Sequence, residues 1–246
     1  MKQRRTVNRV LDVPSPDPRR TSFLADANRR RPIVGKTDLI LSHCTDRTVL
    51  DIGCINHSAD NAIALGDDWL HHRIRGVARS VTGVDMLAGD AAVLNERGYD
   101  IEGADAQNFD LGQTFDVVVA ADVVEHLTNL SGFLRSARRH MHQGSTFILT
   151  TPNPFAFAQM MQVLLRGRAV VNAEHTIWLD PSVAYELLSR EGLRPAELLW
   201  IDSDPGVGAG TWATRLLSLA AAAAGRLRPL VRSNYAVVAR LPDPEP

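Results

Sequence analysis

Several features that would assign the chain to a class of protein are scarce in its sequence. Of its 246 residues only two are cysteines, Cys44 and Cys54, and their spacing does not suggest a metal site. We therefore expect two reduced thiols. The longest apolar run, residues 216–225, has about ten residues and is too short to span a bilayer. We expect it to form a helix that covers a sheet or a partner subunit.

The beginning of the sequence lacks the pattern of a secretory signal. Its arginine-rich start is followed by Asp12 and by a proline-rich stretch at residues 14–18, and not by an apolar segment. We therefore expect a cytoplasmic protein. The rest of the chain also lacks a basic stripe with interleaved aromatic residues, which disfavours a nucleic-acid substrate.

Charge is almost balanced overall but is unevenly distributed. The formal net charge is −1, yet residues 1–31 contain nine Lys or Arg against three Asp. We expect these residues to form a basic, partly disordered arm; the alternative is a lid or a contact for an anionic substrate. Residues 32–246 have the length and the apolar content for one further domain, with a helical insertion at about residues 204–232.

Strands and helices alternate along this domain. Buried β-branched runs and turn residues predict seven strands, at residues 49–52, 81–84, 99–105, 115–120, 145–150, 197–201 and 235–241. Apolar periodicity and capping residues predict helices at residues 33–43, 61–65, 68–80, 88–97, 133–141, 181–190 and 211–228. This order predicts an α/β fold with a doubly wound sheet.

Polar residues follow the first four predicted strands. Asp51 and Gly53 end the first strand, and Asp85, Asp105 and Asp122 end or follow the next three. In an open α/β sheet the ligand lies beyond the carboxyl ends of the strands. Gly53 lets a ligand approach the backbone, and Asp85 can accept both hydroxyls of a ribose. The pattern therefore predicts a nucleoside site.

Three segments carry a resemblance to a known family. Residues 48–54 and 80–85 resemble the first two motifs of class I S-adenosylmethionine-dependent methyltransferases, and residues 121–127 resemble the Asp-x-x-Glu-His-Leu motif of small-molecule members. The resemblance covers about residues 33–201. It implies a Rossmann-like, mostly parallel sheet with an antiparallel last strand. It also implies S-adenosylmethionine as cofactor and S-adenosylhomocysteine as product.

The resemblance also implies roles for individual residues. Asp51 would flank the methionine end of the cofactor, Asp85 would hold the ribose, and Asp105 would face the adenine amino group. Ala121 and Asp122 would line the methionine portion of the cofactor and the mouth of the acceptor pocket. The complete set of expected cofactor-binding residues is Asp51, Gly53, Cys54, His57, Asp85, Met86, Asp105, Ala106, Ala121 and Asp122.

One motif departs from the family pattern. The usual turn runs Gly-x-Gly, but here Gly53 is followed by Cys54, Ile55, Asn56 and His57. A side-chain contact from Asn56 or His57 is expected to replace a backbone amide contact. The missing glycine also argues against a nicotinamide dehydrogenase, because a pyrophosphate needs a G-x-G-x-x-G turn.

A hydroxyl acceptor usually needs a general base, and histidine titrates near neutral pH. We expect His126 or His175 to serve as the base, because both fall in segments expected at the pocket; the alternative for His126 is a structural hydrogen bond at a helix start. His57 is expected at the cofactor. The remaining histidines are expected to be solvated: His43, His71, His72, His140 and His142. We expect no metal, because the carboxylates are committed to the cofactor and no compact His/Asp ligand set remains.

These observations predict a methyltransferase that acts on an oxygen of a small molecule, such as a sugar, a lipid-linked intermediate or a secondary metabolite. The alternative is a homologue that binds the cofactor without transferring its methyl group, as a regulatory or scaffold protein or in another reaction such as a cyclisation. The Ala-rich residues 216–224 offer a contact for a homodimer. No stable membrane insertion is expected.

Overall fold

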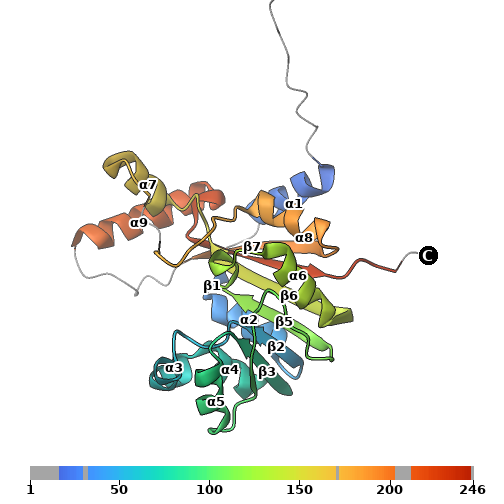
Figure 1. The fold of residues 1–246 in the computed structure, drawn as a ribbon. Coiled ribbons are helices and arrows are strands. Elements are labelled where there is room, and N and C mark those ends of the chain that lie inside the picture. Colours follow the sequence, from blue (N-terminus) through green and yellow to red (C-terminus); the bar gives the residue numbers. More distant parts are fainter. Residues whose placement is uncertain (1–16, 30–32, 170–171, 203–211, 245–246) are drawn as a thin grey trace, which may run out of the picture.

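The computed structural model of the protein describes residues 17–29, 33–169, 172–202 and 212–244. Within these residues eight strands form one sheet, in the order β1-β7-β8-β6-β5-β2-β3-β4 (Figure 1). The strands are β1 (Ile33–Val34), β2 (Thr48–Ile52), β3 (Ser80–Asp85), β4 (Ile101–Gly103), β5 (Phe115–Ala121), β6 (Met141–Pro152), β7 (Arg194–Asp202) and β8 (Asn234–Arg240).

The strand pairing confirms the predicted fold class. Strands β2 to β6 pair in parallel, whereas β8 runs antiparallel to both β6 and β7, as expected for the last strand. All seven predicted strands are present. The two-residue strand β1 was not predicted; it pairs in parallel with the end of β7 and extends that edge of the sheet.

Helices cover both faces of the sheet. They are α1 (Pro18–Arg29), α2 (Lys36–Cys44), α3 (Ala59–Leu65), α4 (Leu70–Val77), α5 (Ala88–Asn95), α6 (Leu130–Arg139), α7 (Phe157–Arg166), α8 (Pro181–Arg190) and α9 (Trp212–Leu227), and the short 3₁₀ helices are η1 (Gly66–Asp68), η2 (Val124–His126) and η3 (Pro229–Val231). Adjacent residues of β5 point to opposite faces: Val118 packs in one core with α1, α6 and α8, and Val117 packs in another with α2 and α4.

Part of the expected basic arm is a packed helix. Residues 18–29 form α1, whose Phe23 and Ala27 are buried in the main core. The Phe23 ring lies against Tyr185 of α8, with 5.1 Å between the ring centroids. Residues 1–16 and 30–32 lie outside the described residues, as does Thr211 at the start of the predicted last helix.

Several predicted boundaries were wrong. The helix predicted at residues 33–43 begins only at Lys36, since the preceding residues form β1 and Gly35 takes a positive φ of 88°. Strand β6 is longer than predicted at both ends, and Pro152 is its last residue, paired with Asn234. A missing N–H group is tolerated best where a strand ends, so Pro152 closes β6 without breaking it.

The prediction that His140 is solvated was also wrong. His140 has no exposed surface, and its ring stacks on Phe109 at 4.6 Å between centroids. The Leu111 N–H donates to Nε2 at 2.9 Å, and Nδ1 lies 2.7 Å from the Ser136 carbonyl oxygen. Both ring nitrogens therefore have hydrogen-bond partners inside the core, which offsets the cost of removing this polar side chain from water.

None of the described helices is both long enough and apolar enough to cross a membrane.

The order of the strands fixes where a ligand can bind. Strand β2 lies at the centre, with β3 on one side and β5 on the other, and the chain moves outward in opposite directions from these two neighbours. This is the topological switch point of the sheet. Ligands of open α/β sheets bind beyond the carboxyl ends of the strands at this point.

Candidate active site

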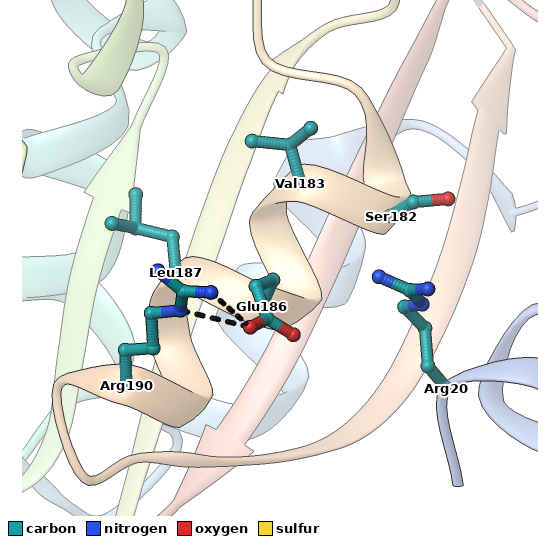
Figure 2. Close-up of a pocket in the computed structure, with 6 residues that line it drawn as sticks. All are labelled: Arg20, Ser182, Val183, Glu186, Leu187 and Arg190. Atoms are coloured by element: carbon teal, nitrogen blue, oxygen red, sulfur yellow. Dashed lines mark hydrogen bonds and ion pairs between the residues drawn. The ribbon is translucent and has the colours of Figure 1, made fainter. Parts of the chain in front are cut away.

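A cavity of about 960 Å³ lies at the carboxyl ends of β2, β3 and β5. Ligand pockets commonly have about 300–1,000 Å³. All twelve residues predicted for the cofactor or for catalysis line this cavity, so the structure brings the whole predicted set together. Figure 2 shows a smaller hollow of about 310 Å³ between α1 and α8, where Glu186 accepts a hydrogen bond from Arg190. No predicted site residue lines that hollow.

Asp85 ends β3 and organises the turn that follows β2. Its Oδ2 accepts a hydrogen bond from the Ile55 N–H at 2.8 Å, and its Oδ1 accepts one from the Leu87 N–H at 3.2 Å. Burial raises the pKa of Asp85, and the two N–H groups oppose this rise. Each carboxylate oxygen keeps further acceptor capacity, which suits a pair of ribose hydroxyls.

The packing of the protein itself, without any ligand, requires a glycine at position 53. Gly53 has a φ of 71°, and a Cβ built on it would lie 2.4 Å from Cγ2 of Val123, in the loop after β5. We expected this glycine because a ligand approaches the backbone, but its close neighbour in the structure is a side chain. The glycine thus lets the β2 and β5 loops meet at the edge of the cavity.

The missing second glycine has a structural explanation. Ile55 occupies that position, and its buried side chain packs in a cluster with Ala59 and Trp69. The Ile55 N–H donates a hydrogen bond to Asp85, which fixes the turn without a second glycine. His57 takes the positive φ that follows, 58°, and its exposed ring lines the cavity.

Asp51 is paired with a histidine that the sequence analysis placed in solvent. His71 of α4 is 1% exposed, and its Nδ1 lies 2.9 Å from Oδ2 of Asp51. The expectation of a solvated His71 was wrong because α4 turns this residue toward the sheet. Among the described residues, Nε2 of His71 has no hydrogen-bond partner. The pair fixes the Asp51 carboxylate at the floor of the cavity.

The residues expected at the adenine lie at the open side of the cavity. Met86 is 79% exposed, and Asp105 is also exposed, with its Oδ1 accepting from the Gln107 N–H at 2.9 Å. Ala106 lines the cavity beside them. A flexible thioether and a carboxylate acceptor suit the flat face and the amino edge of a purine.

Asp122 is held in place on three sides. It has a φ of 55°, its N–H donates to the Thr150 carbonyl at 3.1 Å, and its Oδ1 accepts from the Thr150 hydroxyl at 2.8 Å. Its Oδ2 forms an ion pair with Lys36, the first residue of α2. The Asp122 carboxylate, expected at the mouth of the acceptor pocket, is therefore paired with a lysine that the sequence analysis did not single out.

Glu125, His126 and His175 meet at one point of the cavity. Ligand atoms of these three side chains all lie within 4.8 Å of one another, and the two imidazole rings are edge to face at 4.9 Å. The main chain joins the two segments, since the Thr176 N–H donates to the Glu125 carbonyl at 2.8 Å. We expected no compact His/Asp ligand set; that expectation was wrong, because a glutamate and the loop before α8 complete one.

The protonation of this group follows from its surroundings. Burial, with a smaller contribution from Asp122, raises the pKa of Glu125 to about 7, although the Thr151 hydroxyl donates to it at 2.9 Å. Burial and the neighbouring His126 lower the pKa of His175. The lowered pKa favours the neutral form of His175, which can accept a proton.

A family model described as a methyltransferase domain matches residues 18–198, most of the chain. This chain belongs to the methyltransferase-domain family. The fold and the family together support S-adenosylmethionine as its cofactor.

Two relatives illustrate the family. A probable S-adenosylmethionine-dependent methyltransferase of Mycolicibacterium smegmatis is 28% identical over 172 residues, which cover 68% of this chain and 60% of the relative. A ubiquinone biosynthesis O-methyltransferase of Pseudomonas paraeruginosa is 28% identical over 171 residues, covering 65% and 64%. The alignment thus spans less than two thirds of each relative.

A solved structure shows the same fold. The 1,6-didemethyltoxoflavin-N1-methyltransferase of Burkholderia thailandensis, with 1,6-didemethyltoxoflavin and S-adenosylhomocysteine bound, is 13% identical with a TM-score of 0.52. The match covers 84% of this chain and 76% of that chain. At this identity the likeness concerns the fold alone.

The cavity of this family member fits the cofactor on structural grounds. The two oxygens of Asp85 retain acceptor capacity at the tip of β3, and Asp51 presents a second carboxylate at the floor. The Asp85 carboxylate can accept hydrogen bonds from the ribose hydroxyls, and the Asp51 carboxylate can accept them from the cationic methionine end.

Sequence reasoning missed several residues that line the site or support it. Lys36 is one of two lysines in the chain, Lys2 being the other, and this scarcity is the signal that could have marked it. Glu125 stands inside the quoted fourth motif but received no role. Trp69, whose Nε1 donates to the Cys54 carbonyl at 2.7 Å, and His71 had no signal beyond helical periodicity.

Proposed function

We propose that this protein transfers a methyl group from S-adenosylmethionine to an oxygen of a small molecule: a sugar, a lipid-linked intermediate or a secondary metabolite. The observation that carries the proposal is the meeting of His126 and His175 in the same cavity as Asp51 and Asp85. The similarity to the Pseudomonas O-methyltransferase favours oxygen as the acceptor atom.

The residues divide the work as follows. When bound, the cofactor supplies a methyl group on a positively charged sulfur, which is already activated for transfer. Asp85 holds the ribose hydroxyls, and Asp51, fixed by His71, holds the cationic methionine end. Neutral His175, with His126 beside it, takes the proton of the acceptor hydroxyl. Methyl transfer then depends mainly on alignment and on exclusion of water.

The base assignment predicts a loss of turnover without a loss of cofactor binding. A general base typically raises the rate about 10²–10⁴-fold. Of the variants His126→Asn and His175→Asn, the one that removes the base should therefore lower kcat by roughly that factor. Calorimetric titration of S-adenosylmethionine should give a Kd close to that of the wild type. The matched control is His142→Asn, which changes a half-exposed histidine of β6 outside the cavity.

Full turnover in both cavity variants would refute the base assignment and leave alignment as the source of catalysis. A second readout separates a base from a metal ligand, because Glu125, His126 and His175 lie close enough to bind one divalent ion. Dialysis against EDTA is expected to leave turnover unchanged. Loss of activity on dialysis that added Zn²⁺ restores would reassign the three side chains.

The alternative is a homologue that binds the cofactor but does not transfer its methyl group. Release of S-adenosylhomocysteine in the presence of a panel of hydroxylated acceptors separates the two functions. Acceptor-dependent release supports the transferase, whereas micromolar cofactor binding without release from any acceptor supports the alternative. That the acceptor is not a nucleic acid and that the chain forms a homodimer both stay predictions.

A further inference from the structure

Helices α7 and α9 form a projection with an unusual surface. They contact each other and lie side by side in Figure 1, extending from the sheet on the side away from the C-terminus. We call these two helices and η3 the α7–α9 projection. Its exposed leucines are Leu164, Leu165, Leu216, Leu219, Leu227 and Leu230, which are 44–77% exposed.

The charge of the projection has one sign. Residues 153–173 and 205–233 contain six arginines and no aspartate or glutamate, in a chain whose net charge is −1. Arg166 and Arg168 adjoin the exposed leucines of α7, and Arg226 and Arg228 adjoin Leu227 of α9; all four are exposed. None of the four forms an ion pair with a carboxylate in the part of the chain that the structure describes.

Large exposed leucines beside arginines are the composition of helices that lie in the interface of an anionic bilayer. The apolar side chains enter the acyl boundary, and the guanidinium groups face lipid phosphates. A second copy of the chain is a poorer occupant, because a two-fold contact would bring the same arginines together without any carboxylate from these segments. Since no described helix can cross a bilayer, the contact would be peripheral.

The projection is attached to the rim of the cavity. Pro152, before α7, and Asn172 and His175, after it, all line the cavity, so both ends of the α7 segment return to the site. The Asn153 side chain donates to the carbonyls of Leu230 and Arg232, at 2.6 and 2.7 Å, which ties the exit of β6 to η3. A surface that held the projection would therefore lie beside the mouth of the acceptor pocket.

We propose that the α7–α9 projection docks the protein on an anionic lipid surface. Docking there favours the lipid-linked class among the acceptors considered above, a choice that rests on the proposed function. The docking itself does not depend on catalysis and can be measured without turnover.

The test is sedimentation of the full chain with vesicles of phosphatidylcholine, with and without phosphatidylglycerol. The wild type should bind the anionic vesicles, and less at high salt. The double variant Leu164→Ser/Leu165→Ser should bind about tenfold or more weakly, because two exposed leucines leave the contact. Replacing Arg166 and Arg168 by Gln should cost about fivefold for each charge removed.

Matched controls change side chains of the same kind elsewhere. Val93→Ser/Val183→Ser removes two valines that are 43% and 52% exposed, on α5 and α8. Arg47→Gln/Arg97→Gln removes two exposed charges outside the projection. Both controls should bind vesicles like the wild type, and every variant should bind S-adenosylmethionine with the Kd of the wild type.

Three results would overturn the proposal: no binding to either vesicle, equal binding to both vesicles, or equal losses in the projection variants and the controls. A dimer in light scattering that Leu216→Glu dissociates, without any vesicle binding, would assign the surface to a second copy instead. Vesicle binding without methyl transfer would refute the proposed function alone, and transfer without binding would refute docking alone.

Discussion

At the scale of single residues, Gly53 gives the sharpest expectation for stability. Gly53→Ala places a Cβ at a φ of 71° and within 2.4 Å of Val123, so strain and overlap add. We expect a loss of about 2–5 kcal/mol in the free energy of unfolding, measured by urea denaturation.

Gly112 is the matched control for this substitution. It has a φ of 66° with nothing within 4 Å of a built Cβ, so Gly112→Ala should show the backbone strain alone, about 1 kcal/mol. Adding Val123→Ala to Gly53→Ala should recover part of the difference. Equal costs at the two glycines would contradict the contact with Val123.

Glu125 predicts a dependence of stability on pH. Burial raises its pKa from the ordinary 4.5 to about 7, so the folded protein binds a proton that the unfolded chain releases between these values. The contribution to stability is therefore fully present below about pH 4.5 and is lost as the pH rises through about 7. Glu125→Gln keeps a neutral group, so the variant should become more stable than the wild type above pH 7.

The difference should reach about 3 kcal/mol at pH 8, because the pKa rises from 4.5 to about 7 and a tenfold change in proton affinity corresponds to about 1.4 kcal/mol. Thermal unfolding of both proteins between pH 4 and 8 measures it. The exposed Glu102 provides a comparison, since Glu102→Gln should leave the difference flat across this range. A flat difference for Glu125→Gln would mean that the pKa of this carboxyl is not raised in the folded protein.

At the scale of elements, α1 contributes to the main core although its sequence is basic. Phe23 is 7% exposed and packs on Tyr185, so Phe23→Ala should lower the free energy of unfolding by about 3 kcal/mol. Phe155→Ala is the control, because Phe155 is 45% exposed and its truncation should cost less than about 0.5 kcal/mol. No effect of Phe23→Ala on chemical denaturation would mean that α1 lies on the sheet without stabilising it, as an arm or a lid would.

The elements also show what the sequence could predict. The strands β2 and β5 were predictable because both faces are buried, so their apolar runs are continuous. Helix α1 was not, because Phe23, Leu24 and Ala27 are too few apolar residues among its arginines to mark a buried face. Strand β1 has only two residues, which is too short for any periodicity.

The residues of the site also fall into those that the sequence could predict and those that it could not. Asp51, Asp85 and Asp122 were predictable because strand ends converge at one edge of a parallel sheet. The partners of these carboxylates were not predictable. His71 and Lys36 reach Asp51 and Asp122 from helices. Which residue of a helix faces the end of the sheet depends on how that helix is rotated in the packed fold. Pairing across elements is set by tertiary packing and leaves no local pattern.

At the scale of the whole molecule, cofactor binding should appear as global stability. A ligand at a hundredfold excess over its Kd stabilises the native state by about 2.7 kcal/mol, so S-adenosylmethionine should raise Tm by several degrees. Asp85→Ala should abolish this increment, whatever its effect on the unliganded protein, because Asp85 faces the cavity and also holds the turn. An undiminished increment in the variant would place the ribose elsewhere, and NAD, which should give no shift, is the ligand control.

The acidic lining of the cavity has a consequence for how strongly it attracts the two forms of the cofactor. Asp51, Asp68, Asp85, Asp105 and Asp122 line it, with Lys36 as the one lysine among its lining residues. A cleft lined by one sign of charge concentrates ligands of the opposite sign. S-adenosylhomocysteine lacks the positive charge of the sulfonium, so these carboxylates attract it less than they attract S-adenosylmethionine. The lining therefore favours binding of the charged donor over the uncharged sulfur of the spent cofactor, which would favour product release in the proposed reaction.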